Sequence, residues 1–216
     1  MTPALQSHAL LALCRLAPVI PVLVIDEPAD AAPLARALVE GGLPVLEVTL
    51  RTPAALAAIA AMARVDGARI GAGTVLSAHD AARAKAAGAE FAVAPGATPG
   101  LVGACVARDL PLMPGAATAS EVMTLLEQGY TMLKFFPAAA AGGPRFLSSF
   151  AAPLPRARFC PTGGISAETA PGYLALPNVT CVGGSWIAPP ELLAAKDWAG
   201  IAERARAAAA LATASD

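Results

Sequence analysis

Short apolar runs alternate with alanine-rich amphipathic stretches along almost the whole chain. The apolar runs have the length and composition of buried strands, and the alanine-rich stretches have the period of helices. We predict eight strands, over Val19–Ile25, Val45–Leu50, Arg69–Gly73, Phe91–Ala94, Leu110–Met113, Met132–Phe136, Arg158–Thr162 and Val179–Gly183. We predict helices over Ala29–Glu40, Pro53–Ala63, Ala78–Ala87, Pro99–Arg108, Ala119–Gln128, Arg145–Phe150, Ala167–Leu174 and Trp198–Ala212, with a further helix over Pro3–Leu16.

This alternation is typical of an α/β fold built on a parallel sheet. Eight strand-helix units in 216 residues fit a closed barrel better than an open doubly wound sheet. The open sheet would be expected to carry a glycine-rich dinucleotide fingerprint after its first strand, and the sequence has none. We therefore predict a (β/α)8 TIM barrel with an extra N-terminal helix. No linker divides the chain, so we expect residues 1–216 to form a single domain.

The composition narrows the possible partners. Hydrophobic residues make up 56% of the chain and charged residues 14%, and the formal net charge is -1. Basic residues form no cluster with aromatics and no polybasic patch, so we expect neither nucleic acid nor a membrane as partner. The apolar run from Ala9 to Ile25 is interrupted by Arg15, Pro18 and Pro21, which argues against a signal peptide and favours the cytoplasm.

The four cysteines and two histidines have no zinc-binding spacing. We interpret Cys14, Cys105, Cys160 and Cys181 as small buried hydrophobes in a reducing compartment, and we expect no metal site.

Lys134 is unusual because it lies within the apolar run Met132-Leu133-Lys134-Phe135-Phe136-Pro137, which is predicted to be a buried strand. Removing an ammonium group from water is costly, and a buried lysine often sheds its proton instead. A neutral amine is a nucleophile, so this position is a candidate for covalent catalysis. The alternative is a lysine whose stem is buried while its charged end reaches water at the strand end. Position alone leaves both interpretations open.

Glu47 is the candidate partner of this lysine. Side chains alternate along a strand, so Glu47 and Thr49 share one face, as do Met132, Lys134 and Phe136. In a barrel the carboxyl ends of all strands open at one mouth, and we expect Glu47 and Lys134 to meet there. The alternative is a solvent-facing charge on an edge strand, although a closed barrel has no edge.

Other polar residues follow strands at the same mouth, including Thr74 and Thr162. Arg51 comes directly after the second strand, where its guanidinium is suited to clamp a carboxylate and to supply a cation near Lys134. It is otherwise an ordinary solvated arginine in a loop. Phe136 is expected to form a wall of the site.

Two glycine pairs, Gly163-Gly164 and Gly183-Gly184, follow the last two predicted strands. Exposed backbone N–H groups and a short helix N-terminus at this place commonly bind phosphate in barrels. Ser166 and Ser185 are candidates for additional hydroxyl donors. The alternative is that these glycines end the strands for steric reasons.

The chain resembles the class I aldolases that act on 2-keto-3-deoxy-6-phosphogluconate (KDPG) or 4-hydroxy-2-oxoglutarate. The resemblance covers nearly the whole length and runs through several motifs in order. They are Pro18-Val19-Ile20-Pro21-Val22, Leu46-Glu47-Val48-Thr49-Leu50-Arg51-Thr52, Gly71-Ala72-Gly73-Thr74-Val75-Leu76, Lys134-Phe135-Phe136-Pro137-Ala138, Arg158-Phe159-Cys160-Pro161-Thr162-Gly163-Gly164-Ile165 and Gly183-Gly184-Ser185-Trp186.

The resemblance implies a lyase of the Entner-Doudoroff pathway that uses no cofactor and no metal. It implies that Lys134 forms the Schiff base and that Glu47 is the general acid and base. It further implies that Arg51 and Thr74 bind the carboxylate, that Pro95, Phe136 and Thr162 contact substrate, and that Gly163, Gly164, Gly184 and Ser185 bind phosphate. The expected ligand is a phosphorylated keto acid, and the expected assembly is a homotrimer.

Three other functions remain open at this point. An aldolase for 4-hydroxy-2-oxoglutarate or 2-keto-3-deoxy-6-phosphogalactonate would use the same lysine. A sugar-phosphate isomerase or epimerase would use Glu47 to move protons and Lys134 only to neutralise charge. A phosphate-binding module would perform no catalysis. Two features leave the fine substrate preference open. Alanines follow Pro137, where relatives often carry a glutamate near Ala139, and the Ala116-Ala117 pair is the second feature.

Overall fold

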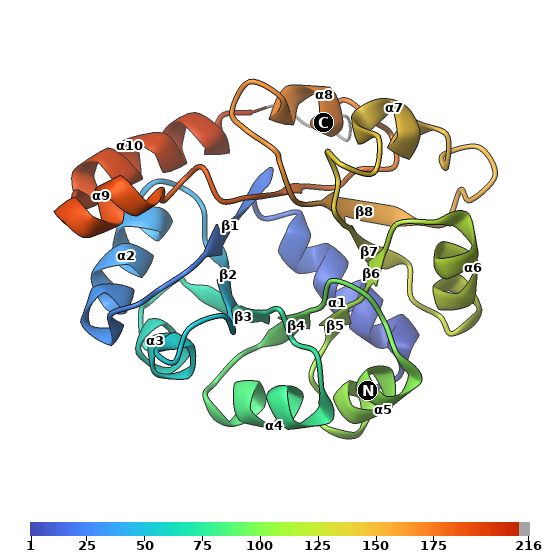
Figure 1. The fold of residues 1–216 in the computed structure, drawn as a ribbon, viewed down its shortest axis with the longest axis horizontal. Helices are drawn as coiled ribbons and strands as arrows, with labels where there is room; N and C mark the ends of the chain where they lie inside the picture. The colour runs from blue at the N-terminus through green and yellow to red at the C-terminus, as the bar shows by residue number, and fades with distance from the viewer. Residues whose placement is uncertain (212–216) are drawn as a thin grey trace.

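Parallel strands form the inner layer of the molecule and helices form its outer layer (Figure 1). The structure is a computed structural model and describes residues 1–211. The strands are β1 (Val19–Leu23), β2 (Val45–Thr49), β3 (Arg69–Gly73), β4 (Phe91–Val93), β5 (Leu112–Met113), β6 (Gly115–Ala116), β7 (Met132–Phe135), β8 (Arg158–Pro161) and β9 (Val182–Gly184).

Except for α9 (Pro190–Ala195), which was not predicted, the helices lie close to their predicted places. They are α1 (Pro3–Cys14), α2 (Pro28–Glu40), α3 (Ala55–Met62), α4 (Ala78–Ala86), α5 (Pro99–Ala107), α6 (Ala119–Glu127), α7 (Gly143–Ser148), α8 (Ala170–Leu174), α9 (Pro190–Ala195) and α10 (Trp198–Ala209). The α/β class and the N-terminal helix are thus confirmed. The predicted end of the last helix at Ala212 lies outside the described residues.

The strands belong to two parallel sheets that curl around a shared interior (Figure 1). One sheet has six strands in the order β5-β4-β3-β2-β1-β9, and the other has three in the order β6-β7-β8. Isolated bridges join Phe159 to Val179 and Thr162 to Gly183, at the side where β8 faces β9.

The predicted fifth and last strands differ from the observed ones. The segment over Leu110–Met113 forms only the short strand β5, and pairing resumes after Pro114 as β6. Proline has no N–H to donate to a ladder, so the strand is interrupted there. The last strand begins at Val182 rather than Val179, because only an isolated bridge holds the earlier residues.

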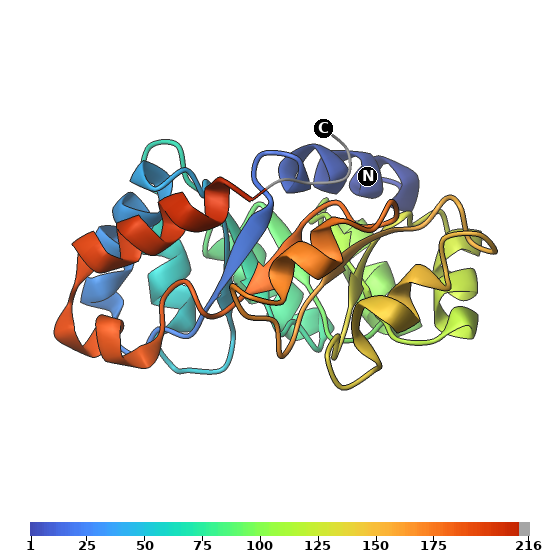
Figure 2. The same cartoon turned by 90° about the horizontal axis from the view of Figure 1, so that it is seen from above.

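Helix α1 lies across one end of the strands, as the two views together show (Figures 1 and 2). It packs against side chains from both sheets in an interior cluster formed by Leu10, Leu13, Cys14, Ile20, Val45, Phe91, Val93, Met113, Met132, Cys160 and Cys181. Buried polar contacts fix the helix in place. The Gln6 side-chain oxygen accepts from the Tyr130 hydroxyl at 2.9 Å and from the Leu112 amide at 3.1 Å.

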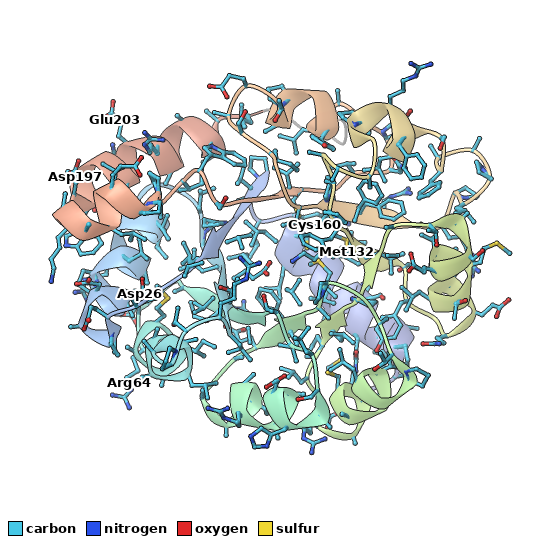
Figure 3. The ribbon with its side chains drawn as sticks, viewed as in Figure 1. Asp26, Arg64, Met132, Cys160, Asp197 and Glu203 are labelled. Carbon is cyan, nitrogen blue, oxygen red and sulfur yellow. The ribbon has the colours of Figure 1, made fainter. Side chains whose placement is uncertain are left out.

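Met132 and Cys160 lie in this interior (Figure 3). Glu203 lies on the outer helix α10, and Asp197 is the residue just before that helix (Figure 3). All four cysteines are buried and free, as predicted. Contacts with Cys14 and Cys160, followed by burial, raise the pKa of the Cys181 thiol well above its ordinary value. Such thiols are inert packing groups.

A second, larger cluster lies between the strands and the outer helices, and it contains Leu46, Val48, Leu133 and Phe135. These side chains alternate along β2 and β7 with Glu47 and Lys134, so they lie on the opposite faces of the two strands. Among residues 1–211, no helix combines the length and the apolar character needed to cross a membrane.

Candidate active site

Lys134 lies in the interior of the curled sheets. Its strand neighbours Leu133 and Phe135 belong to the outer cluster and Met132 belongs to the interior cluster, so alternation turns Lys134 inward. Its amide donates to the Pro114 carbonyl at 2.9 Å, which fixes its place next to β6. The side chain is only 6% exposed, so the amine does not reach bulk water.

Glu47 meets this amine. The Lys134 Nζ atom lies 3.3 Å from the Glu47 Oε1 atom, and the Glu47 side chain is 4% exposed. The contact predicted from the sequence is therefore present. The two groups form a hydrogen bond, and contact between a proton donor and acceptor is the geometric basis of general acid-base catalysis. Buried ionisable groups this close are characteristic of functional sites.

Phe136 connects this pair to the first glycine pair. The Lys134 Nζ atom lies 5.3 Å from the centre of the Phe136 ring. A Cβ atom on Gly163 would lie 3.2 Å from the same ring, so the loop after β8 passes close to it. Phe136 therefore lies near both the Lys134 amine and the loop after β8, and its role as a wall of the site stays a prediction.

Arg51 and Thr74, both expected to bind the carboxylate, contact each other. The Arg51 Nε atom donates to the Thr74 hydroxyl at 3.4 Å. Thr74 has a φ of 56°, in the left-handed region that residues other than glycine seldom occupy. Backbone strain of this kind clusters at functional sites. The guanidinium is exposed, which leaves its remaining N–H groups available to an incoming anion.

Arg51 and Ser185 also line one cavity, of about 740 Å³, together with Val22, Val24, Trp186, residues of α9 and the carboxylates Asp26, Glu27 and Asp30. Asp26 lies in the loop between β1 and α2, to one side of the interior (Figure 3). Neither α9 nor these carboxylates were predicted from the sequence. The Pro189-Pro190-Glu191 run was the available signal, since proline and an acidic residue favour a helix start.

The two glycine pairs have different local geometry. Gly163 and Gly164 have φ angles of 102° and 72°, so their loop needs the left-handed backbone that glycine allows. Gly183 and Gly184 instead make room, since Cβ atoms there would overlap the side chains of Thr162 and Trp186.

Thr162 is 7% exposed and lies against Gly183. The backbone of Pro95 lies against Gly115 at the start of β6. The Ser166 hydroxyl donates to the Glu168 carboxylate at 2.5 Å, and this bond is the main cause of the lowered pKa of Glu168. Ser166 is therefore engaged locally, and α8 begins at Ala170 instead of Ala167.

Comparison with known proteins agrees with this geometry. Residues 10–204 match the model of the KDPG and KHG aldolase family. The chain belongs to this family. It is thus an aldolase, a lyase that acts on a carbon-carbon bond. A 2-dehydro-3-deoxy-phosphogluconate aldolase from Zymomonas mobilis is 55% identical over 175 residues, which cover 81% of this chain and 84% of the relative.

Two solved structures extend the comparison. The 2-keto-3-deoxy-6-phosphogluconate aldolase of Zymomonas mobilis ZM4, solved with 3-phosphoglycerate, has a TM-score of 0.90 and 51% identity, covering 94% of this chain and 96% of that one. The KDPG aldolase of Legionella pneumophila has a TM-score of 0.89 and 48% identity, covering 93% and 98%. That structure holds pyruvate captured as a covalent carbinolamine intermediate.

Proposed function

We propose that this chain cleaves 2-keto-3-deoxy-6-phosphogluconate to pyruvate and glyceraldehyde 3-phosphate through a Schiff base on Lys134. The observation that carries the proposal is the buried Lys134 amine, 3.3 Å from the Glu47 carboxylate inside the curled sheets. An amine held out of water beside a proton carrier is the combination that covalent catalysis on a ketone requires.

The reaction begins when Glu47 accepts a proton from the Lys134 ammonium group, and the resulting neutral amine attacks the C2 carbonyl. A C–N bond forms, the carbonyl electrons move to oxygen, and proton transfers through Glu47 yield a neutral carbinolamine. Glu47 then protonates the C2 hydroxyl, which leaves as water, and the iminium forms. The carbinolamine held by the Legionella relative supports this first half. The positively charged iminium nitrogen is the electron sink for the next step.

Cleavage follows from the iminium. Glu47 accepts the proton of the C4 hydroxyl, the C3–C4 bond breaks, and its electrons move into the enamine as the C4 aldehyde forms. Glyceraldehyde 3-phosphate leaves. Glu47 returns its proton to C3, and water hydrolyses the regenerated iminium to release pyruvate and the free amine of Lys134. One carboxyl group serves all these transfers, which matches its single close contact with the amine.

The two ends of the substrate bind to different elements. We assign the carboxylate to Arg51 and Thr74, whose side chains already touch. We assign the phosphate to Gly163, Gly164, Gly184 and Ser185, an assignment supported by the phosphate-bearing ligand of the Zymomonas relative. Pro95, Phe136 and Thr162 line the space between. Fixing both ends holds the scissile bond over the lysine and lowers the entropic barrier.

We further propose that the strands close into an eight-stranded (β/α)8 barrel within a single domain over 1–216. The bridges between β8 and β9 support closure on one side, and the single residue Pro114 between β5 and β6 supports it on the other. By resemblance to the family we propose a homotrimer, which light scattering would test. The four free cysteines favour the cytoplasm.

Cleavage rates measured for KDPG, for 2-keto-3-deoxy-6-phosphogalactonate and for 4-hydroxy-2-oxoglutarate distinguish between the candidate substrates. The proposal predicts the highest kcat/KM for KDPG. A higher value for either of the others would reassign the substrate while keeping the lysine chemistry. Isomerisation or epimerisation of a sugar phosphate with no pyruvate release would contradict the mechanism itself.

A further inference from the structure

Gly73 is the last residue of β3, and it lies directly against the Glu47 side chain. A Cβ atom at this position would overlap Glu47 Oε1 and would lie 2.7 Å from Cγ and 2.8 Å from Cδ. These distances are shorter than non-bonded carbon atoms tolerate. The carboxylate therefore occupies the space that any other residue at this position would fill.

The backbone does not explain this glycine. Gly73 is in a strand, outside the left-handed region, so an alanine would fit its backbone conformation. Glycine weakens a strand interior and often marks a close approach by another group. Here the approaching group is the buried carboxylate that contacts Lys134.

Gly71 provides a matched comparison within the same strand. Gly71 and Gly73 share the inward face of β3 because they are two residues apart. A Cβ atom at Gly71 would overlap the ring of Phe91, which belongs to the interior cluster. Gly71 thus makes room for a packing residue, whereas Gly73 makes room for a group in the proposed chemistry.

We propose that Gly73 is a positioning residue that leaves space for the Glu47 carboxylate to reach Lys134. This inference rests on the proposed function, because it assigns a role to the contact that the mechanism uses. The contact of 3.3 Å is near the upper limit for a hydrogen bond, so a displacement of a few tenths of an ångström breaks it.

The test compares Gly73→Ala with Gly71→Ala by steady-state cleavage of KDPG and by thermal unfolding. Both variants overpack the interior, so both should unfold at lower temperature. We expect kcat to fall about 100-fold in Gly73→Ala, because misplacing a catalytic group by about 1 Å has an effect of this size. We expect Gly71→Ala to keep kcat within about 3-fold of wild type. Equal kcat values for the two variants would overturn the inference.

Rescue by a shorter side chain makes the test specific. Glu47→Asp withdraws the carboxylate by one methylene and lowers kcat by itself. In that background Gly73→Ala should lower kcat by a smaller factor than it does with Glu47 in place, because the overlap at Oε1 is gone and only the short approach to Cγ remains. Fully multiplicative losses would contradict the proposal. If Gly73→Ala does not fold, the double variant should fold, and failure of both to fold would equally contradict it.

The KM of Gly73→Ala shows whether the substitution displaces Glu47 or disturbs the neighbouring Thr74. A disturbed Thr74 would weaken carboxylate binding and raise KM, whereas a displaced Glu47 lowers kcat with KM changed by less than about 2-fold. A rise in KM as large as the fall in kcat would overturn the inference.

Failure of the proposed function would be recognised independently of this inference. Wild type would then neither cleave KDPG nor form a borohydride-reduced adduct with pyruvate. A crystal structure of Gly73→Ala would then decide the positioning claim: an unmoved carboxylate would refute it, and a displaced one would support it.

Discussion

Replacing Lys134 by methionine tests the mechanism and the buried pair together. Methionine keeps much of the length of the lysine side chain and fills the same interior space, but it has no amine. Cleavage through a Schiff base is then impossible, and we expect kcat to fall by at least about 10⁴-fold, the scale seen when a nucleophile is removed.

The effect on stability follows from the geometry of the pair. Two unit charges 3.3 Å apart attract by about 5 kcal/mol at an effective dielectric constant of about 20. Removing one member of a buried pair typically destabilises a protein by about 3–5 kcal/mol, since the other charge stays buried without a partner. We therefore expect Lys134→Met to lower the free energy of unfolding by about 3–5 kcal/mol.

The double variant Lys134→Met/Glu47→Gln is the control. It removes the unpaired charge, so it should be more stable than Lys134→Met and equally inactive. Urea unfolding followed by circular dichroism gives the stabilities, and a coupled assay for pyruvate gives the rates. Turnover above about 1% of wild type in either variant would refute the assignment of Lys134. A single variant as stable as wild type would refute the description of the pair.

Three further predictions concern other parts of the molecule. Thr74→Gly should keep or raise stability by up to about 1 kcal/mol, because it relieves the left-handed backbone. KM should nevertheless rise, since Arg51 loses its hydroxyl partner. Gln6→Leu should lower the free energy of unfolding by about 1–3 kcal/mol, because two buried donors lose their acceptor. Tyr130→Phe should lower it by only about 1 kcal/mol, and equal losses of the two variants in urea unfolding would contradict this. Hydrogen bonds from backbone amides and a threonine hydroxyl hold the pKa of Glu121 below its ordinary value, so its stabilisation is present above about pH 4.5 and is lost as the pH falls. Between about pH 6 and pH 3, Glu121→Gln should therefore lose less stability than wild type, and parallel curves would refute the argument.

The parts of the site that the sequence predicted correctly follow from strand alternation. Glu47 and Lys134 were expected to meet because side chains alternate along each strand and the strands open at one mouth, and the contact is present. Period-two alternation is a local property that tertiary packing does not change once the strand exists. The separation of outer and interior clusters could be predicted for the same reason.

Other features depend on interactions that a single sequence does not display. The split between β5 and β6 depends on which N–H groups the neighbouring strands need as donors. Only the observed strand pairing shows that the ladder is interrupted at Pro114. Helix α9 is six residues long and has no buried residue, so it leaves no amphipathic pattern to detect. The role of Gly73 depends on where a side chain of another strand lies.

The central claim is that the Lys134 amine forms the covalent bond to substrate. The most direct measurement is borohydride reduction in the presence of pyruvate, followed by digestion and mass spectrometry of the peptides. We expect one stoichiometric adduct, on the peptide that contains Lys134, and none in Lys134→Met. An adduct located on Lys85 or Lys196, or no adduct in an enzyme that cleaves KDPG, would contradict it.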